Sequence, residues 1–66
     1  MKIRLNGDDR EVVENLTVAE LVGELGLLPA QVAVEVNREL VPRAQRDQAH
    51  LRNGDEIEMV TLVGGG

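Results

Sequence analysis

The chain has 66 residues, a formal net charge of −5 at pH 7, no cysteine and no aromatic residue. This size allows one domain with a small core, and the absence of cysteine excludes a disulfide framework and a cysteine-based zinc site. The scattered basic residues and the lack of aromatic rings also argue against nucleic-acid binding, which needs clustered positive charge or stacking platforms.

The beginning of the chain predicts a β-hairpin. Apolar and polar side chains alternate over residues 1–6, which is typical of a half-buried strand. Asn6-Gly7 is a strong hairpin-turn signal, and residues 10–14 have the composition of a returning strand. We therefore expect the chain to open with two antiparallel strands.

A helix is expected to begin at Thr17. Thr17 and Glu20 have the spacing of a capping box, in which each side chain satisfies an unpaired backbone N–H group. The apolar residues that follow have the spacing of one helical face: Val18, Leu21, Val22 and Leu25. Gly26 is suited to a left-handed helix C-cap. Gly23, inside the helix, costs about 1 kcal/mol relative to alanine, and close packing against the sheet would explain its presence.

Two more strands and a loop follow the helix. A third strand is expected at residues 33–37 and a short fourth strand at residues 40–42. Pro42 cannot donate a ladder hydrogen bond, so the fourth strand lies at a sheet edge or ends there. Residues 43–51 have weak periodicity and predict a loop with one short helical turn.

The longest strand signal covers residues 56–63, after a second turn at Asn53-Gly54. Its side chains should alternate between two faces, with Ile57, Met59 and Thr61 on one and Glu58, Val60 and Leu62 on the other. The helix should cover the first of these faces. The element order is then β-β-α-β-β-β, which predicts an α+β fold with one main helix packed on one face of a mixed sheet.

No pattern in the sequence predicts an enzyme active site. Serine and cysteine are absent and His50 is the only histidine, so a nucleophile–base pair is hard to assemble. We interpret His50 beside Asp47 as part of a solvent-exposed polar loop rather than as a metal site. Glu56 and Glu58 alternate on a strand without a cleft that could separate their pKa values, so we interpret them as a solvated face. We predict no catalytic residue and no metal site.

Targeting and membrane-spanning segments are also not predicted. Residues 1–9 lack the apolar run of a signal peptide, and no apolar stretch approaches the roughly 20 residues that cross a bilayer. Together with the absence of cysteine, these features are consistent with a reducing compartment. We therefore expect a cytoplasmic protein.

The sequence ends in three glycines: Gly64, Gly65 and Gly66. We expect residues 1–63 to form the domain and residues 64–66 to form a flexible C-terminal tail. A chain without Cβ atoms can pass through a narrow slot. Its α-carboxylate, with a pKa of about 3.5, would reach about 10 Å beyond the last strand. The alternative is a frayed or engineered end.

A tail of this kind needs a folded body that docks first. Ordering its glycines costs about 3–6 kcal/mol, which contacts of the tail alone cannot offset. The candidate docking residues are Val60, Leu62 and Glu58, which share one strand face, because exposed apolar patches on small proteins often mark partner sites. The alternative is that loops of the same chain cover Val60 and Leu62.

The chain resembles the ThiS family of ubiquitin-like sulfur carriers over essentially its whole length. The resemblance rests on four stretches: KIRLNG at residues 2–7, TVAELVGEL at 17–25, VAVEVNRELVPR at 32–43 and NGDEIEMVTLVGGG at 53–66. The VNRELVPR and GDEIEMVTLVGGG segments are fairly specific, whereas a terminal Gly-Gly alone is shared by all ubiquitin-like carriers. The resemblance implies a β-grasp fold, which is consistent with the predicted element order.

The resemblance also implies that the chain is a protein co-substrate and not an enzyme. A ThiF-like adenylyltransferase, with its own ATP and magnesium, would adenylate the carboxylate of Gly66. A persulfide from a sulfurtransferase would displace AMP, and a ThiG-like thiazole synthase would accept the thiocarboxylate in thiamine biosynthesis. Gly64 and Gly65 would be the tail residues required in the partner active sites. The chain itself would bind no cofactor, nucleic acid or membrane.

Other functions stay open from the sequence. The MoaD-like small subunit of molybdopterin synthase is the nearest competitor, although those chains are usually longer and carry aromatic residues. Carriers for cysteine synthesis or tRNA thiolation and a protein modifier are further alternatives, with Lys2 as the only lysine. Outside this class, the alternatives are a plain interaction domain with an incidental tail and a ligand-binding domain centred on His50.

Overall fold

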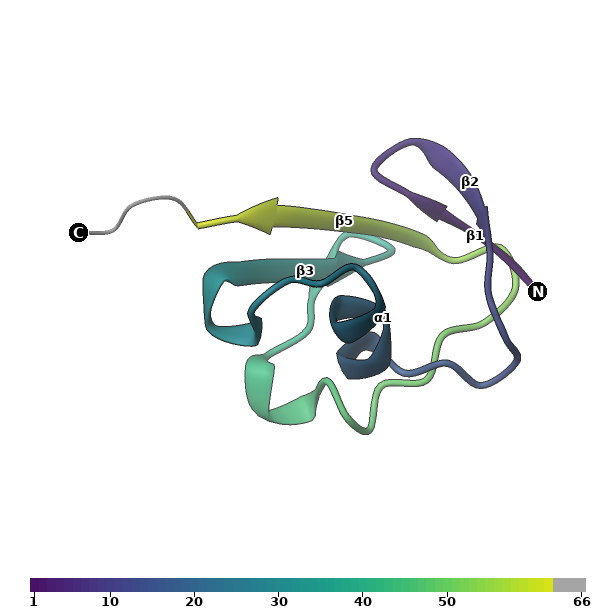
Figure 1. Ribbon diagram of the computed structural model, residues 1–66. Helices are drawn as coiled ribbons and strands as arrows, with labels where there is room; N and C mark the ends of the chain where they lie inside the picture. The colour runs from purple at the N-terminus through teal and green to yellow at the C-terminus, as the bar shows by residue number, and fades with distance from the viewer. Residues whose placement is uncertain (63–66) are drawn as a thin grey trace.

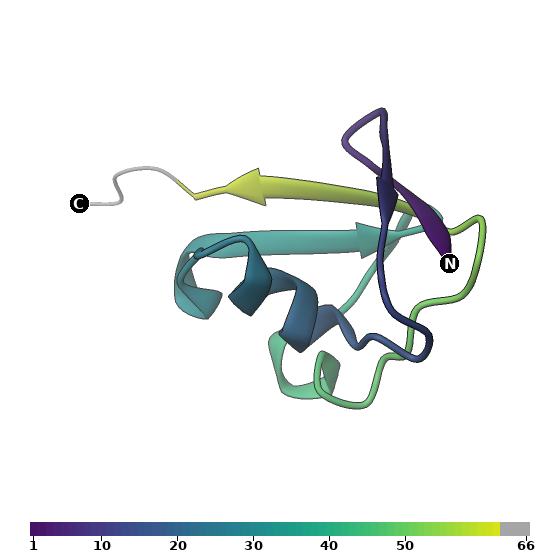
Figure 2. The same cartoon turned by 45° about the vertical axis from the view of Figure 1, so that its right-hand side comes forward.

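A mixed sheet in the order β2-β1-β5-β3-β4 organises the computed structural model, which describes residues 1–62. Its strands are β1 (Lys2–Leu5), β2 (Asp8–Glu11), β3 (Val32–Val36), β4 (Glu39–Leu40) and β5 (Glu56–Thr61). The central strand β5 runs parallel to β1 and antiparallel to β3. The helix α1 (Val18–Glu24) lies on one face of this sheet (Figures 1 and 2). The predicted α+β arrangement is confirmed.

The first hairpin turns at Asn6-Gly7, as predicted. Both residues have positive φ, 50° at Asn6 and 87° at Gly7, as a type I′ turn requires. Because this turn contains only two residues, Leu5 pairs with Asp8 and β2 begins immediately after Gly7. The expected range of 10–14 for the returning strand is therefore wrong, because it allows for a longer turn.

The helix α1 begins at the predicted capping box. The backbone N of Glu20 donates to Oγ1 of Thr17 over 3.1 Å, and the backbone N of Thr17 donates to Oε1 of Glu20 over 2.9 Å. The Thr17 hydroxyl also donates to Oε1 of Glu20, over 3.0 Å. The backbone N–H of Thr17 first, and then this hydroxyl, hold the pKa of Glu20 below its ordinary value of 4.5. At the other end Gly26 has a φ of 71°, and N of Leu27 donates to O of Val22 over 3.2 Å, which confirms the left-handed C-cap.

Gly23 lies on the exposed side of α1. A Cβ atom at this position would meet no atom within 4 Å, so the expected close packing against the sheet is wrong. The cost of glycine in this helix, about 1 kcal/mol relative to alanine, therefore has no compensating contact in the described part of the chain.

The core fills the space between α1 and the sheet. Its buried apolar residues are Ile3, Leu16, Val18, Leu21, Val22, Val32, Val34, Leu51, Ile57 and Met59. Ile57 and Met59 are 0% and 8% exposed, so the inward face of β5 is correctly predicted for both. Thr61, the third residue of that set, is exposed at the end of the strand.

Two 3₁₀ turns complete the described chain. The turn η1 (Pro29–Gln31), which the sequence does not predict, leads directly into β3. The turn η2 (Arg43–Gln45) confirms the short helical turn expected after Pro42. The strand β4 ends before Pro42 and lies at the edge of the sheet, as the proline predicts.

Candidate functional site

The first half of β5 is held on both sides. β1 pairs with β5 at Glu56 and Ile57. Beyond this pairing the side chain of Asn6 replaces the β1 backbone as the hydrogen-bond partner of β5. Oδ1 of Asn6 accepts a hydrogen bond from N of Met59 (2.8 Å), and Nδ2 donates to O of Met59 (3.2 Å). On the other side β3 pairs with β5 as far as Thr61. The strand that leads to the predicted tail is thus anchored in the centre of the sheet.

The end of β5 presents apolar side chains on the sheet face opposite α1. Val60 is 60% exposed and Leu62 is 56% exposed. N of Leu62 donates to O of Gln31 over 2.6 Å, so backbone pairing with the β3 side continues past the end of the strand. The alternative in which loops of the same chain cover Val60 and Leu62 is wrong for residues 1–62. We call Glu58, Val60 and Leu62 the β5 outer patch.

The β5 outer patch also carries negative charge. Glu58 is exposed and lies directly opposite Glu35 of β3, and like charges at paired positions are unfavourable by about 0.2–1 kcal/mol. Within residues 1–62, the ion pairs shorter than 4 Å all belong to the Met1 amino group, with Glu11 and Glu14 as partners. No lysine or arginine of the described chain therefore neutralises Glu35 and Glu58 by a direct ion pair.

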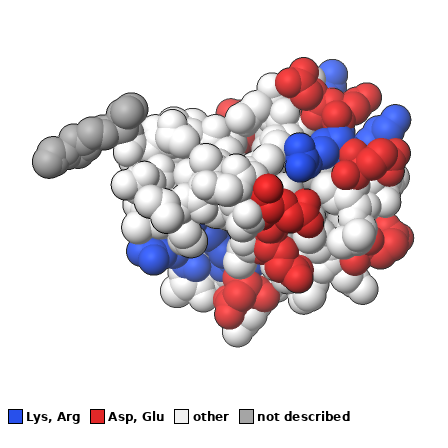
Figure 3. Space-filling model, viewed as in Figure 1, with Lys and Arg blue, Asp and Glu red and all other residues white. Residues whose placement is uncertain are grey.

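Figure 3 shows how charge is distributed in the same view as Figure 1. The surface near the end of β5 carries few charged atoms, whereas acidic side chains gather toward the β1–β2 hairpin. Basic side chains appear below the β5 end, on the side of the molecule that α1 occupies. The end of β5 thus combines exposed apolar side chains with two acidic residues, Glu58 and Glu35, on the side nearer the middle of the strand.

The glycines that carry the predicted chemistry lie outside the described residues. The roles of Gly64, Gly65 and Gly66, and the boundary between residues 1–63 and 64–66, stay predictions. The structure describes the chain as far as Leu62, which directly follows the central strand. In the sequence, Val63 alone separates the outer patch from the predicted tail.

The remaining polar candidates do not form an active site. His50 is exposed, and its Nδ1 lies 3.1 Å from O of Asn15. Glu56 and Glu58 line an open hollow together with Asn6 and Gly7. Among the described residues, no group of three or more His, Asp and Glu side chains could hold a metal ion. None of the helices in residues 1–62 has the length and apolar character needed to cross a membrane.

One buried charge that supports this end of the molecule is not predicted by any sequence pattern. Arg46 is buried, and its guanidinium donates to O of Pro29 (2.9 Å) and O of Val32 (2.6 Å). Gln31 lies between these two residues and accepts the hydrogen bond from Leu62. A weakly periodic loop gives no signal for such a role, because the carbonyl partners are distant in sequence.

Comparisons with known proteins agree with this architecture. The crystal structure of the thiamine biosynthesis protein ThiS from Geobacter metallireducens superposes with a TM-score of 0.85 at 35% identity, covering all of both chains. The chain is 32% identical to the sulfur carrier protein ThiS of Escherichia coli (strain K12), again over all of both chains. The fold and these likenesses define a ubiquitin-like β-grasp protein.

The family is shown by the sequence match. The model of the ThiS family matches residues 3–66, and the chain belongs to this family. It is also 42% identical to the thiazole synthase of Paramagnetospirillum magneticum (strain ATCC 700264 / AMB-1), over all of this chain but only 20% of that protein. The chain thus spans about a fifth of the length of the thiazole synthases that it matches.

Proposed function

We propose that this chain is a sulfur carrier that supplies sulfur for thiazole formation in thiamine biosynthesis. The match to the ThiS family over residues 3–66 carries the proposal. The whole-length likeness to a sulfur carrier protein supports it. A thiazole synthase that contains a region similar to this chain supports such an enzyme as the sulfur acceptor.

The proposed chemistry takes place at the carboxylate of Gly66. One carboxylate oxygen attacks the α-phosphorus of ATP, which a ThiF-like adenylyltransferase holds with magnesium, and pyrophosphate leaves. A persulfide sulfur of a sulfurtransferase then attacks the acyl carbon of the adenylate, and AMP leaves. A thiol cleaves the resulting S–S bond and becomes part of a disulfide, so the carrier keeps a thiocarboxylate. Thiazole synthase transfers the sulfur to its substrate: the C–S bond of the thiocarboxylate breaks, and an oxygen from the substrate carbonyl or from water replaces the sulfur, which restores the carboxylate.

In this scheme the chain supplies no catalytic side chain and holds no cofactor. Its contribution is to bring Gly66 into two partner active sites, with Gly64 and Gly65 allowing passage through a narrow entrance. The free thiols that this scheme uses persist in a reducing compartment. We therefore keep a cytoplasmic location as part of the proposal.

The β5 outer patch is the proposed docking surface. Complete burial of an exposed valine or leucine contributes about 1.5–3 kcal/mol. Val60 and Leu62 are a little over half exposed, so together they can supply about 2–4 kcal/mol. Ordering the glycines costs about 3–6 kcal/mol. The apolar contacts therefore offset most of that cost but leave no surplus, and further contacts are required.

The unneutralised carboxylates supply a further contact. Glu58 and Glu35 face each other across β5 and β3, and a cation from the partner would relieve their repulsion and gain a charge-assisted hydrogen bond. The partner surface we propose is therefore apolar at its centre with an arginine or lysine at its border. Charge complementarity of this kind favours fast and selective association.

Intact-mass measurement tests the proposed function. Incubation with the adenylating enzyme, ATP, magnesium and a persulfide donor is expected to raise the mass by about 16 Da, as one oxygen is replaced by sulfur. The matched control lacks Gly65 and Gly66 and should show no gain. An unchanged mass of the full chain, with an enzyme that is active on another carrier, would contradict the proposal.

A further inference from the structure

Arg46 carries a buried positive charge that the described chain does not neutralise. Its side chain is only 6% exposed, and a guanidinium does not lose its proton in proteins. Two of its N–H groups reach the carbonyl oxygens of Pro29 and Val32. Within residues 1–62, its Nε atom is buried without a hydrogen-bond partner, and no carboxylate forms an ion pair with it. A buried charge without a counter-ion is costly.

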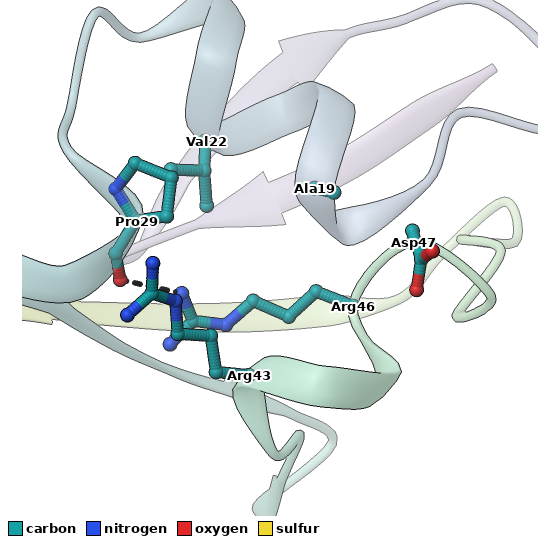
Figure 4. Close-up of a pocket in the computed structure, with 6 residues that line it drawn as sticks. All are labelled: Ala19, Val22, Pro29, Arg43, Arg46 and Asp47. Atoms are coloured by element: carbon teal, nitrogen blue, oxygen red, sulfur yellow. Dashed lines mark hydrogen bonds between the residues drawn. The ribbon is translucent and has the colours of Figure 1, made fainter.

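This guanidinium lines a cavity of about 130 Å³ between α1, η1 and η2. The lining residues are Ala19, Val22, Pro29, Arg43, Arg46 and Asp47 (Figure 4). In Figure 4 the side chains of Arg43 and Arg46 both extend toward Pro29, whereas Asp47 lies at the opposite end of the group. A cavity needs only about 10–15 Å³ by this measure to hold one water, so there is room for a ligand of several atoms.

We propose that this cavity binds a small tetrahedral oxyanion of the phosphate or sulfate class. Arg43 is exposed and offers its guanidinium N–H groups, and Arg46 adds the terminal N–H groups that do not bond to Pro29 and Val32. Planar sets of N–H donors suit oxyanions best. Ala19 and Val22 form an apolar wall from α1, which lowers the local dielectric and strengthens the attraction. Two like charges on one wall disfavour a metal cation, and the donors would stay unpaired beside an apolar ligand.

Asp47 limits the affinity of this cavity for an anion. Asp47 lines the same cavity, and a carboxylate there repels an anion, so the affinity should be modest. The site lies on the α1 side of the sheet, whereas the β5 outer patch lies on the opposite face. The proposal therefore stands independently of the sulfur-carrier function.

An NMR titration tests the proposal in the intact chain. Sodium phosphate and sodium sulfate are added at constant ionic strength against sodium chloride, and the Nε–Hε signals of Arg43 and Arg46 are followed. Saturable shifts with either oxyanion, and none of that kind with chloride, are expected. Arg43→Gln should weaken the apparent affinity at least tenfold. Arg38→Gln, at an exposed arginine in the β3–β4 turn, is the matched control and should leave the affinity unchanged.

A second variant reports on the same cavity without touching its donors. Asp47→Asn removes the repulsive carboxylate and should tighten oxyanion binding about two- to fivefold. Arg46 is left intact because its side chain also holds η1 in place. The proposal fails if the shifts stay linear and equal for all three salts, or if Arg43→Gln titrates like the unaltered chain.

Discussion

The first half of β5, which we take up to Met59, and its second half, which we extend to Leu62 directly after the strand, share one alternating sequence pattern but have different roles. In the first half, Ile57 and Met59 reach the core and the backbone has partners on both sides. In the second half, Val60 and Leu62 expose large apolar side chains, and the pairing partners lie on the β3 side. Similar residue types therefore hold the fold together at one end and form a candidate docking surface at the other.

This contrast separates stability from partner binding. Substitutions in the first half should change the free energy of unfolding, because they remove buried contacts. Substitutions in the second half should leave that free energy nearly unchanged and alter association with a partner. Variants matched in chemistry but placed in different halves can therefore test the account.

The largest expected effect comes from Ile57→Ala. Truncating this fully buried side chain should lower the free energy of unfolding by about 3–4 kcal/mol. A chain of 66 residues has a total of about 3–10 kcal/mol, so this loss is severe. Val60→Ala, the partner variant in the exposed half, should cost less than about 0.5 kcal/mol. Urea unfolding followed by circular dichroism measures both, and equal losses would contradict the contrast.

Asn6→Gly should give the next largest loss, about 2 kcal/mol, because it removes both side-chain bonds to Met59. Glycine tolerates the positive φ at this position, so the change isolates the hydrogen bonds from the turn. Asn15→Gly is the matched control, since Asn15 also has positive φ. Similar unfolding midpoints for the two variants would show that the Asn6 bridge does not hold β5.

Glu20→Gln tests the helix that covers the first half of β5. The pKa of Glu20 is lowered in the folded state, mainly by the backbone N–H of Thr17, so the folded state binds this proton less tightly than the unfolded state. Its contribution to stability is therefore complete above its ordinary pKa of 4.5 and is lost as the pH falls through the lowered pKa.

The measurement compares unfolding midpoints of the unaltered chain and Glu20→Gln from about pH 7 to about pH 3. The gap between them should be largest at neutral pH and should shrink toward low pH. Glu24→Gln, on the exposed surface of the same helix, is the control without a cap. A gap that does not depend on pH would exclude the capping interaction as its source.

Glu58→Gln should have the smallest effect on stability, and of opposite sign. Removing one carboxylate from the Glu35–Glu58 pair should raise the free energy of unfolding by up to about 0.5 kcal/mol. The same change should weaken binding to a basic partner a few-fold. Calorimetric titration with the adenylating enzyme measures the binding, with Glu39→Gln as control. Weaker binding in both variants alike would point to net charge rather than to this pair.

Local signals in the sequence predicted much of the fold. The Asn6-Gly7 turn, the Thr17 capping box and the alternation along β5 depend on neighbouring residues. The structure confirms the turn, the capping box and the burial of Ile57 and Met59, whereas Thr61 is exposed. The boundaries of β2 are harder to predict than its existence, because they depend on the length of the turn before Asp8. Local chemistry thus predicts which elements form better than where each one begins.

Long-range contacts could not be read from the sequence. Asn6 bonds to a residue 53 positions away, and Arg46 bonds to a carbonyl 17 positions away, so neither role leaves a local pattern. The alternation of apolar and polar residues predicted that Val60 and Leu62 lie on one face. Whether they are exposed is decided by the rest of the fold, which could have placed another segment over that face. Only the assembled sheet shows that no segment of residues 1–62 covers the outer patch.

The most direct test of the docking account is the adenylation of the tail. Val60→Asp places a charge in the β5 outer patch without touching the core, and kcat/KM for ATP–pyrophosphate exchange by the adenylating enzyme is expected to fall at least tenfold. Val13→Asp makes the same change at a valine that is 66% exposed elsewhere on the surface, and its kcat/KM should match that of the unaltered chain. Equal kcat/KM for Val60→Asp and Val13→Asp would contradict the assignment of the outer patch as the docking surface.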